Sequence, residues 1–186
     1  INDGNHLEWQ IRKVVPWENN LFFIRTWNMG IYLFDKEEGK YIRYFNHSDN
    51  NPVSLADNNV LDIIINYRNE VYVSTANGLC LYNPSTAGFT TYRPNSPAAG
   101  LSNFLGKMTE DKDGNLWITS LQGLFFFNTK TKIFTRYTTA DGLLNNQSNR
   151  VCMDKNNRLW ITTMTGISLF DPAKKQFYNF STREGL

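Results

Sequence analysis

This chain of 186 residues has little net charge, few histidines and cysteines, and no long apolar run. Its 19 basic and 17 acidic residues give a formal net charge of +2, which leaves no electrostatic footprint for nucleic acid and no basic run suited to a membrane surface. No apolar run approaches the roughly 18 residues that a membrane-spanning helix needs. The first residues lack both the charged and the apolar part of a signal peptide, so we expect no leader within this sequence.

Metal-binding and nucleophilic residues are also few. Cys80 and Cys152 lie in separate apolar runs, which favours two buried free thiols over a disulfide. His6 and His47 lie in polar segments without a partner at metal-ligand spacing, and we interpret both as solvated loop residues. The chain has no phosphate loop, no Gly-x-Ser-x-Gly and no His-Glu-x-x-His sequence. We therefore predict no catalytic residue, no bound metal and no cofactor.

What the chain has instead is a repeat. Four glycines recur, and each is followed by one aromatic residue eleven positions later and by a second one fourteen positions later. The glycines with their aromatic pairs are Gly30 with Tyr41 and Tyr44, Gly78 with Phe89 and Tyr92, Gly123 with Phe134 and Tyr137, and Gly166 with Phe177 and Phe180. A period of this length indicates one structural unit that is copied and stacked.

Each repeat contains four short apolar segments separated by turn residues, and none has the 3.6-residue period of a helix. We name these segments strands A to D, with strand A expected at residues 10–15, 60–65, 105–109 and 150–153. Four-stranded units at this period predict an all-β fold made of antiparallel β-propeller blades. We place the four blades of a single segment at about residues 8–55, 56–101, 102–143 and 144–186.

Strand B carries two further repeated features. Its aromatic residues are expected to fill the space between neighbouring blades; they are Phe23, Tyr72, Trp117 and Trp160. A hydroxyl residue follows each aromatic by three positions, and we expect it to bond the backbone at the end of the strand. The hydroxyl residues are Thr26, Thr75, Ser120 and Thr163.

The unit resembles the two-component regulator propeller repeat. That repeat runs through Asp, a Gly-Asn turn, Leu-Trp-Ile, Thr, Gly-Leu, Phe-Asp-Pro, Phe-x-x-Tyr and Asp-Gly-Leu. The third and fourth copies match best, over residues 111–143 and 154–186. The first copy has Phe23 and the second has Tyr72 where the pattern has Trp.

The resemblance implies a location and a role. Such repeats form the periplasmic sensor region of hybrid two-component histidine kinases, notably in glycan-degrading Bacteroidetes, and the family's ligands are mostly oligosaccharides. It implies a periplasmic part of an inner-membrane protein that signals to a cytoplasmic kinase outside this sequence. Because the family builds seven or more blades per ring, we interpret the four blades as an arc. Its implied partners are the remaining blades and, by analogy, a second copy in a homodimer.

Ligand-binding candidates lie where the copies differ. In a propeller the B–C loops and the D–A connections converge on one face, and here they are rich in amides with a few aromatic and basic residues. Amides pair with sugar hydroxyls, aromatic rings pack on pyranose faces and Arg binds carboxylate or sulfate, so an oligosaccharide is favoured. Trp27, in a loop one residue longer than its counterparts, is the most specific candidate. The candidates are Arg25, Trp27, Asn28, Asn58, Asn59, Asn77, Asn103, Gln122, Asn146, Asn149 and Arg150.

Two other functions stay open. A protein-interaction propeller would use the same face, where Trp27, Phe104 and Met164 could form an apolar contact. A propeller polysaccharide lyase or glycosidase is a third reading, but it predicts clustered carboxylates, His or Tyr on a rim that is mostly amide. The fold alone cannot choose among these, because propellers serve many functions.

Overall fold

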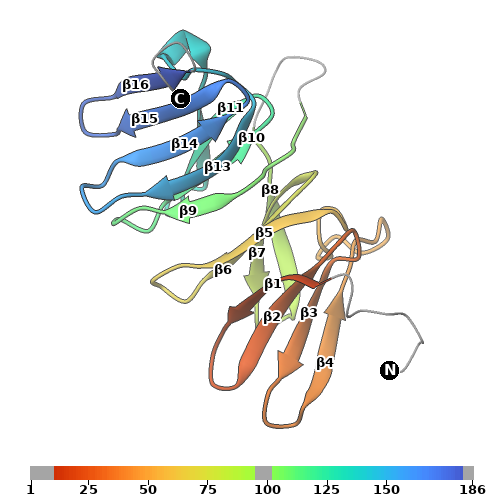
Figure 1. The fold of residues 1–186 in the computed structure, drawn as a ribbon. Coiled ribbons are helices and arrows are strands. Elements are labelled where there is room, and N and C mark those ends of the chain that lie inside the picture. Colours follow the sequence, from red (N-terminus) through yellow and green to blue (C-terminus); the bar gives the residue numbers. More distant parts are fainter. Residues whose placement is uncertain (1–10, 95–101, 182–186) are drawn as a thin grey trace. The chain divides into compact units, whose positions relative to one another are not determined.

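The regular secondary structure of the described residues is almost entirely β-strand. The computed structural model describes residues 11–94 and 102–181, in which the strands form four four-stranded antiparallel sheets (Figure 1). Within each sheet the strands follow one another in sequence order. In these two ranges the helical element is a single 3-10 turn, η2 (Thr139–Asp141), and no helix is long and apolar enough to cross a membrane. The structure confirms the predicted all-β fold of four antiparallel blades.

We number the sheets as blades 1 to 4. Blade 1 contains β1 (Ile11–Pro16), β2 (Leu21–Thr26), β3 (Ile31–Asp35) and β4 (Lys40–Phe45). Blade 2 contains β5 (Val60–Ile65), β6 (Val71–Thr75), β7 (Gly78–Asn83) and β8 (Gly88–Tyr92). Blade 3 contains β9 (Met108–Glu110), β10 (Leu116–Ser120), β11 (Gly123–Asn128) and β12 (Ile133–Tyr137). Blade 4 contains β13 (Ser148–Met153), β14 (Leu159–Thr163), β15 (Gly166–Asp171) and β16 (Gln176–Ser181).

The chain divides into two compact units, Ile1–Thr91 and Tyr92–Leu186. The first unit contains a core shared by blades 1 and 2, and the second a core shared by blades 3 and 4. In the first unit β5 packs against β1 and β2, and in the second β13 packs against β9 and β10. In both units, strand A of the later blade therefore lies against strands A and B of the earlier one.

Each B strand ends in a hydroxyl group that closes the next hairpin. The hydroxyls donate to the carbonyl oxygen of the repeat's glycine at 2.8 to 3.0 Å, and the donors are Thr26, Thr75, Ser120 and Thr163. In blades 2, 3 and 4 the hydroxyl oxygen itself also accepts the backbone N–H of the residue two positions after the hydroxyl residue. These bonds satisfy loop backbone groups that would otherwise need water, and they confirm the predicted role of the hydroxyls.

The repeat's glycine is required where strands C and D approach each other. Gly123 and Gly166 have φ angles of +134° and +145°, which are unfavourable for an L side chain. A Cβ built on Gly123 would lie 2.3 Å from the carbonyl oxygen of Tyr137, and one on Gly166 would meet strand D of its own blade at the same distance. The glycine therefore recurs because no side chain fits between the two strands.

Four aromatic rings at equivalent positions pack between the two blades of each unit. In the second unit the ring centroids are 4.3 to 6.3 Å apart, and the rings are Trp117, Tyr137, Phe170 and Phe177. In the first unit the centroids are 5.3 to 6.4 Å apart, and the rings are Phe23, Phe45, Tyr82 and Phe89. The inter-blade packing predicted for Phe23 and Trp117 is confirmed.

The first repeat departs from the predicted aromatic spacing. Strand β4 carries one extra residue, Ile42, against β3. Because this bulge shifts the register, Phe45 lies in the inter-blade core and is only 7% exposed. Tyr44 is 41% exposed and stacks instead on Tyr32 at 4.6 Å. Tyr44, which stands at the repeat's fourteen-residue spacing, therefore lies outside the core, since one added residue turns a side chain to the opposite face of a strand.

The two cysteines differ in their surroundings. Neither forms a disulfide, but only Cys80 is buried, whereas Cys152 is exposed, so the prediction of burial is wrong for Cys152. Cys152 lies opposite Trp160 across β13 and β14. Trp160 is half-buried and stacks on Phe180 of its own blade at 6.1 Å. The face of blade 4 that carries Cys152 and Trp160 corresponds to the face of blade 3 that packs against blade 4.

His47 holds the connection that follows blade 1. Its Nδ1 lies 2.7 Å from the carbonyl oxygen of Leu55, and its Nε2 lies 3.0 Å from a carboxylate oxygen of Asp49. The bond to the Leu55 carbonyl is the main cause that raises the pKa of His47, and Asp49 adds to it. His47 is therefore a bonded loop residue and not simply a solvated one, while His6 lies outside the described residues.

We expect an NMR titration of the His47 imidazole to give a pKa above its ordinary ~6.5. Because folding favours the protonated ring, the stabilisation is complete below that ordinary pKa and is lost as the pH rises through the higher folded pKa. Asp49→Asn should lower the pKa only in part, since the Leu55 carbonyl makes the larger contribution. A His47 pKa at or below the ordinary value would contradict this assignment.

Candidate ligand-binding rim

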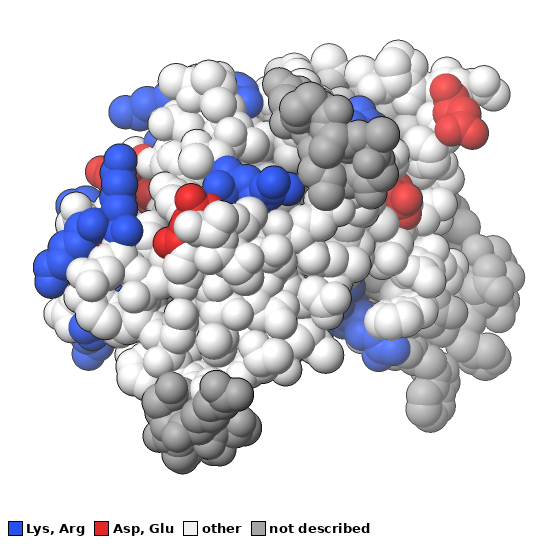
Figure 2. Space-filling view, turned by 90° about the horizontal axis from the view of Figure 1, so that it is seen from above, with Lys and Arg blue, Asp and Glu red and all other residues white. Residues whose placement is uncertain are grey.

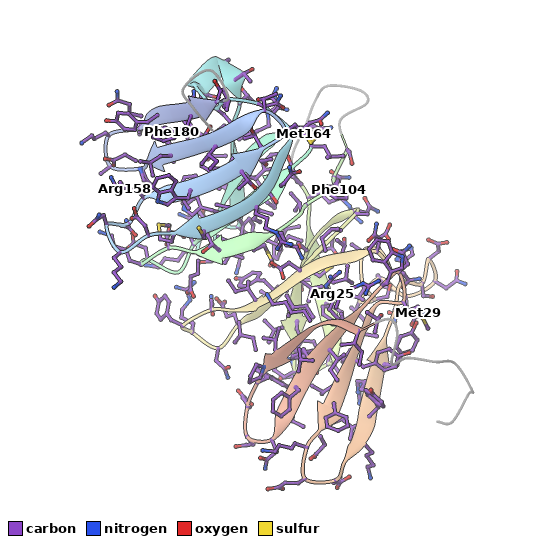
Figure 3. All side chains as sticks on the ribbon, viewed as in Figure 1. Arg25, Met29, Phe104, Arg158, Met164 and Phe180 are labelled. Atoms are coloured by element: carbon purple, nitrogen blue, oxygen red, sulfur yellow. The ribbon has the colours of Figure 1, made fainter. Side chains whose placement is uncertain are left out.

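We define the rim as the B–C loops together with the A-strand residues beside them. The B–C loops are residues 27–29, 76–77, 121–122 and 164–165. In Figure 3, Met29 marks this end of blade 1 and Met164 marks it in blade 4, at the opposite end of the sheet from Arg158.

Strand A bulges at the rim in three blades. The register between strands A and B shifts by one residue there, and the extra residues are Arg12, Leu61 and Asn149. A bulge re-aims a side chain at the edge of a sheet. No sequence pattern predicted these bulges, because an extra residue inside an apolar strand needs neither a turn residue nor a gap in the repeat.

The bulge of blade 1 places Arg12 beside the loop tryptophan. The guanidinium carbon of Arg12 lies 5.2 Å from the centre of the Trp27 ring, which is within the range of a cation–π contact. Trp27 is 57% exposed, and Arg12 is exposed as well. A flat apolar ring and a guanidinium group are therefore both open to solvent. Arg12 was not among the predicted candidates, since only the bulge brings it to this loop.

Arg25 lies in the contact between blades 1 and 2. Its side chain is 9% exposed, and Nη1 donates to the carbonyl oxygen of Val60 at 2.6 Å. Its Nε has no hydrogen-bond partner among the described residues. Burial is the main cause that lowers the pKa of Arg25, and the Asp62 carboxylate opposes it. Asp62 also pairs with Lys13 at 2.8 Å, so charged groups link the two blades here.

The amide candidates of the first unit differ in whether their side chains form hydrogen bonds with backbone groups. The Asn58 side chain accepts the backbone N–H of His47 at 2.7 Å, and the Asn77 amide lies 3.5 Å from a backbone oxygen of the preceding connection. Asn59 is half-buried. Asn28 is exposed at the loop tip, with a φ of +52° that Asn tolerates better than most residues. Asn28 is therefore the amide that joins Trp27 on the open surface.

Blade 4 has a similar pair at its rim. The bulge residue Asn149 donates from Nδ2 to the sulfur of Met164 at 3.9 Å. Met164 is 63% exposed and follows the strand-B hydroxyl directly, as Trp27 does in blade 1. Arg150 is exposed, and its backbone N–H bonds the Thr162 hydroxyl at 3.1 Å.

The remaining candidates of the second unit contribute less open surface. The side chain of Asn146 accepts the backbone N–H of Thr139 at 2.9 Å. Asn103 and Gln122 are half-buried. Among the predicted residues, those whose side chains are exposed are Trp27 and Asn28 in the first unit and Asn149 and Arg150 in the second. Figure 2 shows that most of the surface on the face it presents is uncharged.

Comparison with known proteins gives one match at the level of sequence. No curated protein matches the chain. Residues 142–165 match the two component regulator propeller family model. These residues include β13, β14 and the rim pair of blade 4. The family resemblance noted in the sequence thus has its direct support in the fourth copy.

Solved structures extend the likeness of the fold to nearly the whole chain. An extracellular domain from B. thetaiotaomicron, described as that of the hybrid two component system BT3049, superposes with a TM-score of 0.80 at 23% identity over 95% of this chain and 23% of that one. The extracellular domain of BT4673 from the same organism gives a TM-score of 0.81 at 18% identity over 94% of this chain and 25% of that one. A streptogramin B lyase gives 0.67 at 18% identity over 92% of this chain and 54% of that one.

These structures establish the fold. At such identities they say nothing of this chain's ligand, and the fold is shared between extracellular domains of hybrid two component systems and a lyase. The chain spans about a quarter of the length of the two extracellular domains. The four sheets described above are blades of the β-propeller type, as the sequence predicted.

Proposed function

We propose that this chain is a ligand-sensing propeller segment of a periplasmic receptor. In this proposal the segment has no catalytic role: it recognises an oligosaccharide and passes the signal to a histidine kinase outside this sequence. Support comes from the two component regulator propeller match in the fourth blade and from the propeller fold shared with extracellular domains of hybrid two component systems. Signalling then requires that the ligand favour one arrangement of the receptor over another.

The observation that carries the proposal is the pair formed by Trp27 and Arg12. An exposed indole next to a guanidinium suits a pyranose ring that carries a carboxylate or sulfate, because the ring packs on the indole and the acid group pairs with the fork of Arg. Asn28 adds an amide that both donates and accepts hydrogen bonds. No backbone or core contact of the repeat calls for Trp at this loop position, where the other blades have Ala76, Leu121 and Met164.

Trp27→Ala is expected to weaken oligosaccharide binding roughly 5- to 150-fold, which corresponds to the ~1–3 kcal/mol of a buried aromatic anchor. The measurement is calorimetry on the complete extracellular region, with a glycan selected on an array. Because Trp27 is 57% exposed in the free protein, the midpoint of thermal unfolding should stay unchanged. Met164→Ala is the matched control at the corresponding loop of blade 4. Equal affinity of the Trp27 variant and the wild type would remove Trp27 from the site.

A protein partner is the second candidate. Leu121 and Met164 follow the strand-B hydroxyl in blades 3 and 4, and they are 52% and 63% exposed. Exposed apolar side chains at the same loop position of neighbouring blades can form an interaction surface. The glycan array separates the two functions, because a protein-binding rim would retain no glycan. A lyase or glycosidase is the third reading and would be revealed by turnover of the bound glycan.

We also propose that another blade covers the exposed face of blade 4. Cys152, Trp160 and Phe180 lie on this face, and Trp160 occupies the register that is buried in blade 3. A further blade would bury these rings as blade 4 buries Trp117. The alternative is that a second copy of the receptor, in a homodimer, covers this face of blade 4. Chemical labelling of the Cys152 thiol in the complete extracellular region distinguishes an open face from a covered one.

A further inference from the structure

A cavity of about 220 Å³ lies between blades 1 and 2. It is lined by Arg43 and Asn46 at the end of β4, by Asn51 of the connection that joins the blades, and by Thr86 of the C–D turn in blade 2. All of its lining residues belong to the first unit. Because β4 is the last strand of its sheet, this cavity lies at the sheet edge opposite to β1, which carries Arg12 of the rim.

The connection between the blades is longer in the first unit than in the second. It spans residues 46–59 between β4 and β5, whereas its counterpart spans residues 138–147 between β12 and β13. The shorter connection packs directly onto blade 4. There, a Cβ on Gly142 would lie 3.4 Å from the Phe177 side chain, and the Gly142 carbonyl oxygen accepts the Asn179 amide at 3.0 Å. The longer connection is thus a place where the copies differ, and part of it lines the cavity.

Hydrogen bonds hold the longer connection in place. The carbonyl oxygen of Val53 accepts the backbone N–H of Phe89, in β8, at 2.7 Å. The Ser54 hydroxyl accepts the backbone N–H of Ser48 and donates to the Ser48 carbonyl oxygen, both at 3.0 Å. The Ser54 hydroxyl is therefore engaged within the connection. The walls of the cavity are fixed by the fold before any ligand binds.

Arg43 is the charged residue of the lining. It lies opposite Leu33 across β3 and β4, so its side chain is on the face of blade 1 that packs against blade 2. Burial raises the pKa of Tyr82 in blade 2, and the charge of Arg43 opposes this rise. Among the described residues Arg43 forms no hydrogen bond or ion pair, and none of the residues that line the cavity is Asp or Glu. A cation without an anion of its own beside a cavity favours an anionic ligand.

The rest of the lining supplies neutral donors and apolar surface. Asn46 is exposed, and its side chain makes no hydrogen bond within the described part of the chain. Asn51 uses its side-chain oxygen, which accepts the backbone N–H of Val53 at 3.2 Å. Both amide NH₂ groups are therefore able to donate. The rings of Phe45 and Phe89, which are 7% and 3% exposed, form the apolar part.

These groups select a small organic acid. A carboxylate accepts paired N–H groups from a guanidinium and single ones from amides. An ammonium group would meet the charge of Arg43 and find no lining carboxylate. An inorganic anion would leave the surfaces of Phe45 and Phe89 without an apolar contact, which a hydrocarbon group provides. The volume is below the range of drug-sized pockets, so it fits a molecule with one ring or a short chain.

We propose that this cavity is a binding site for a small organic carboxylate. The carboxylate pairs with Arg43 and with the amides of Asn46 and Asn51, and the hydrocarbon part packs on Phe45 and Phe89. Because the lining comes from both blades and from their connection, a bound acid bridges the two blades of the first unit. The site is separate from the rim and does not depend on the proposed function.

The test is saturation-transfer NMR on the full chain, which detects weak binding of small molecules. Benzoate is the probe, with benzamide as its neutral counterpart and benzylammonium as the cationic one. We expect saturable signals from benzoate at millimolar concentration and none from the other two. Arg43→Gln should lower the affinity for benzoate by about tenfold or more, since the charge-assisted hydrogen bonds are lost. Arg136→Gln, at an exposed arginine of β12, is the matched control and should leave the binding unchanged.

A second variant separates the cavity from its charge. Thr86 is exposed in the C–D turn, so Thr86→Phe fills the cavity without removing Arg43 or disturbing the core, and benzoate binding should be lost. If this variant binds benzoate like the wild type, the acid lies elsewhere on the surface and the proposal fails.

Three further results would also overturn it. Absence of any benzoate signal means that the cavity holds solvent only. Equal signals from benzamide mean that no acid is recognised, and signals from benzylammonium alone mean that the cavity takes cations. None of these variants changes the rim, so failure of this site is distinguishable from failure of the proposed function, which the Trp27→Ala measurement tests.

Discussion

Trp117→Ala is expected to lower the free energy of unfolding of the second unit by about 3–5 kcal/mol. The ring is 3% exposed and packs against Phe126, Tyr137 and Phe170 with centroid distances of 4.8, 5.5 and 5.5 Å. Its removal leaves a void between two sheets, because each sheet is held in register by its own ladder and cannot collapse into the space. Part of the loss is offset, since the unpaired indole N–H is removed with the ring.

The matched control is Trp160→Ala, which removes the same ring from the same register of the next blade. Trp160 is half-buried and stacks on one ring of its own blade, so its removal should cost clearly less than that of Trp117. Guanidinium unfolding followed by far-UV circular dichroism measures both losses. Equal losses would mean that the ring cluster is not what joins blades 3 and 4.

Gly123→Ala is expected to destabilise the same unit by roughly 2–6 kcal/mol, since backbone strain and overpacking each cost about 1–3 kcal/mol. The φ of Gly123 is +134°, and a Cβ there would lie 2.3 Å from the carbonyl oxygen of Tyr137. That oxygen belongs to backbone, so no side-chain rotation relieves the contact. To accommodate the methyl group, strands β11 and β12 must separate and break the ladder that pairs Leu124 with Tyr137.

Gly39→Ala is the control for a positive φ without a steric contact. Gly39 has a φ of +63°, and a Cβ there would meet nothing within 4 Å. Other blades carry non-glycine residues at this turn position with positive φ, namely Ala87, Lys132 and Lys175. We therefore expect a loss of only about 1 kcal/mol. A Gly39 variant as destabilised as the Gly123 variant would show that the dihedral angle, and not the clash with strand D, explains the repeat's glycine.

Much of the fold could be predicted because residues with the same structural role recur at the same spacing in every copy of the repeat. The hydroxyl three residues after each strand-B aromatic has one local task, which is to bond the glycine carbonyl four or three positions on, and that task depends on spacing along the chain alone. The aromatic of strand B likewise needs only the alternation of a strand to point it at the next blade. For Phe23 and Trp117 that alternation was enough.

The candidate site could be predicted only in part. Trp27 was found because its loop is one residue longer, which is visible in the sequence. Arg12 was missed, because a bulge inside β1 decides that its side chain reaches the same loop. Arg25 lies one residue before the hydroxyl position and suggested a rim residue, yet its side chain is drawn into the contact with blade 2 by the Val60 carbonyl.

The sequence by itself determined the number of blades, their strand order and the residues that must be glycine, hydroxyl or aromatic. These properties arise from interactions over a few residues, which recur with the period of the chain. Only the tertiary structure decided which residue of a bulged strand faces inward, as with Phe45 in place of Tyr44, and which polar groups are left without a partner, as with the Trp117 indole. The physical reason is that a bulge and a buried donor both depend on an opposing strand or blade far away in the sequence, and no local pattern records what that neighbour offers.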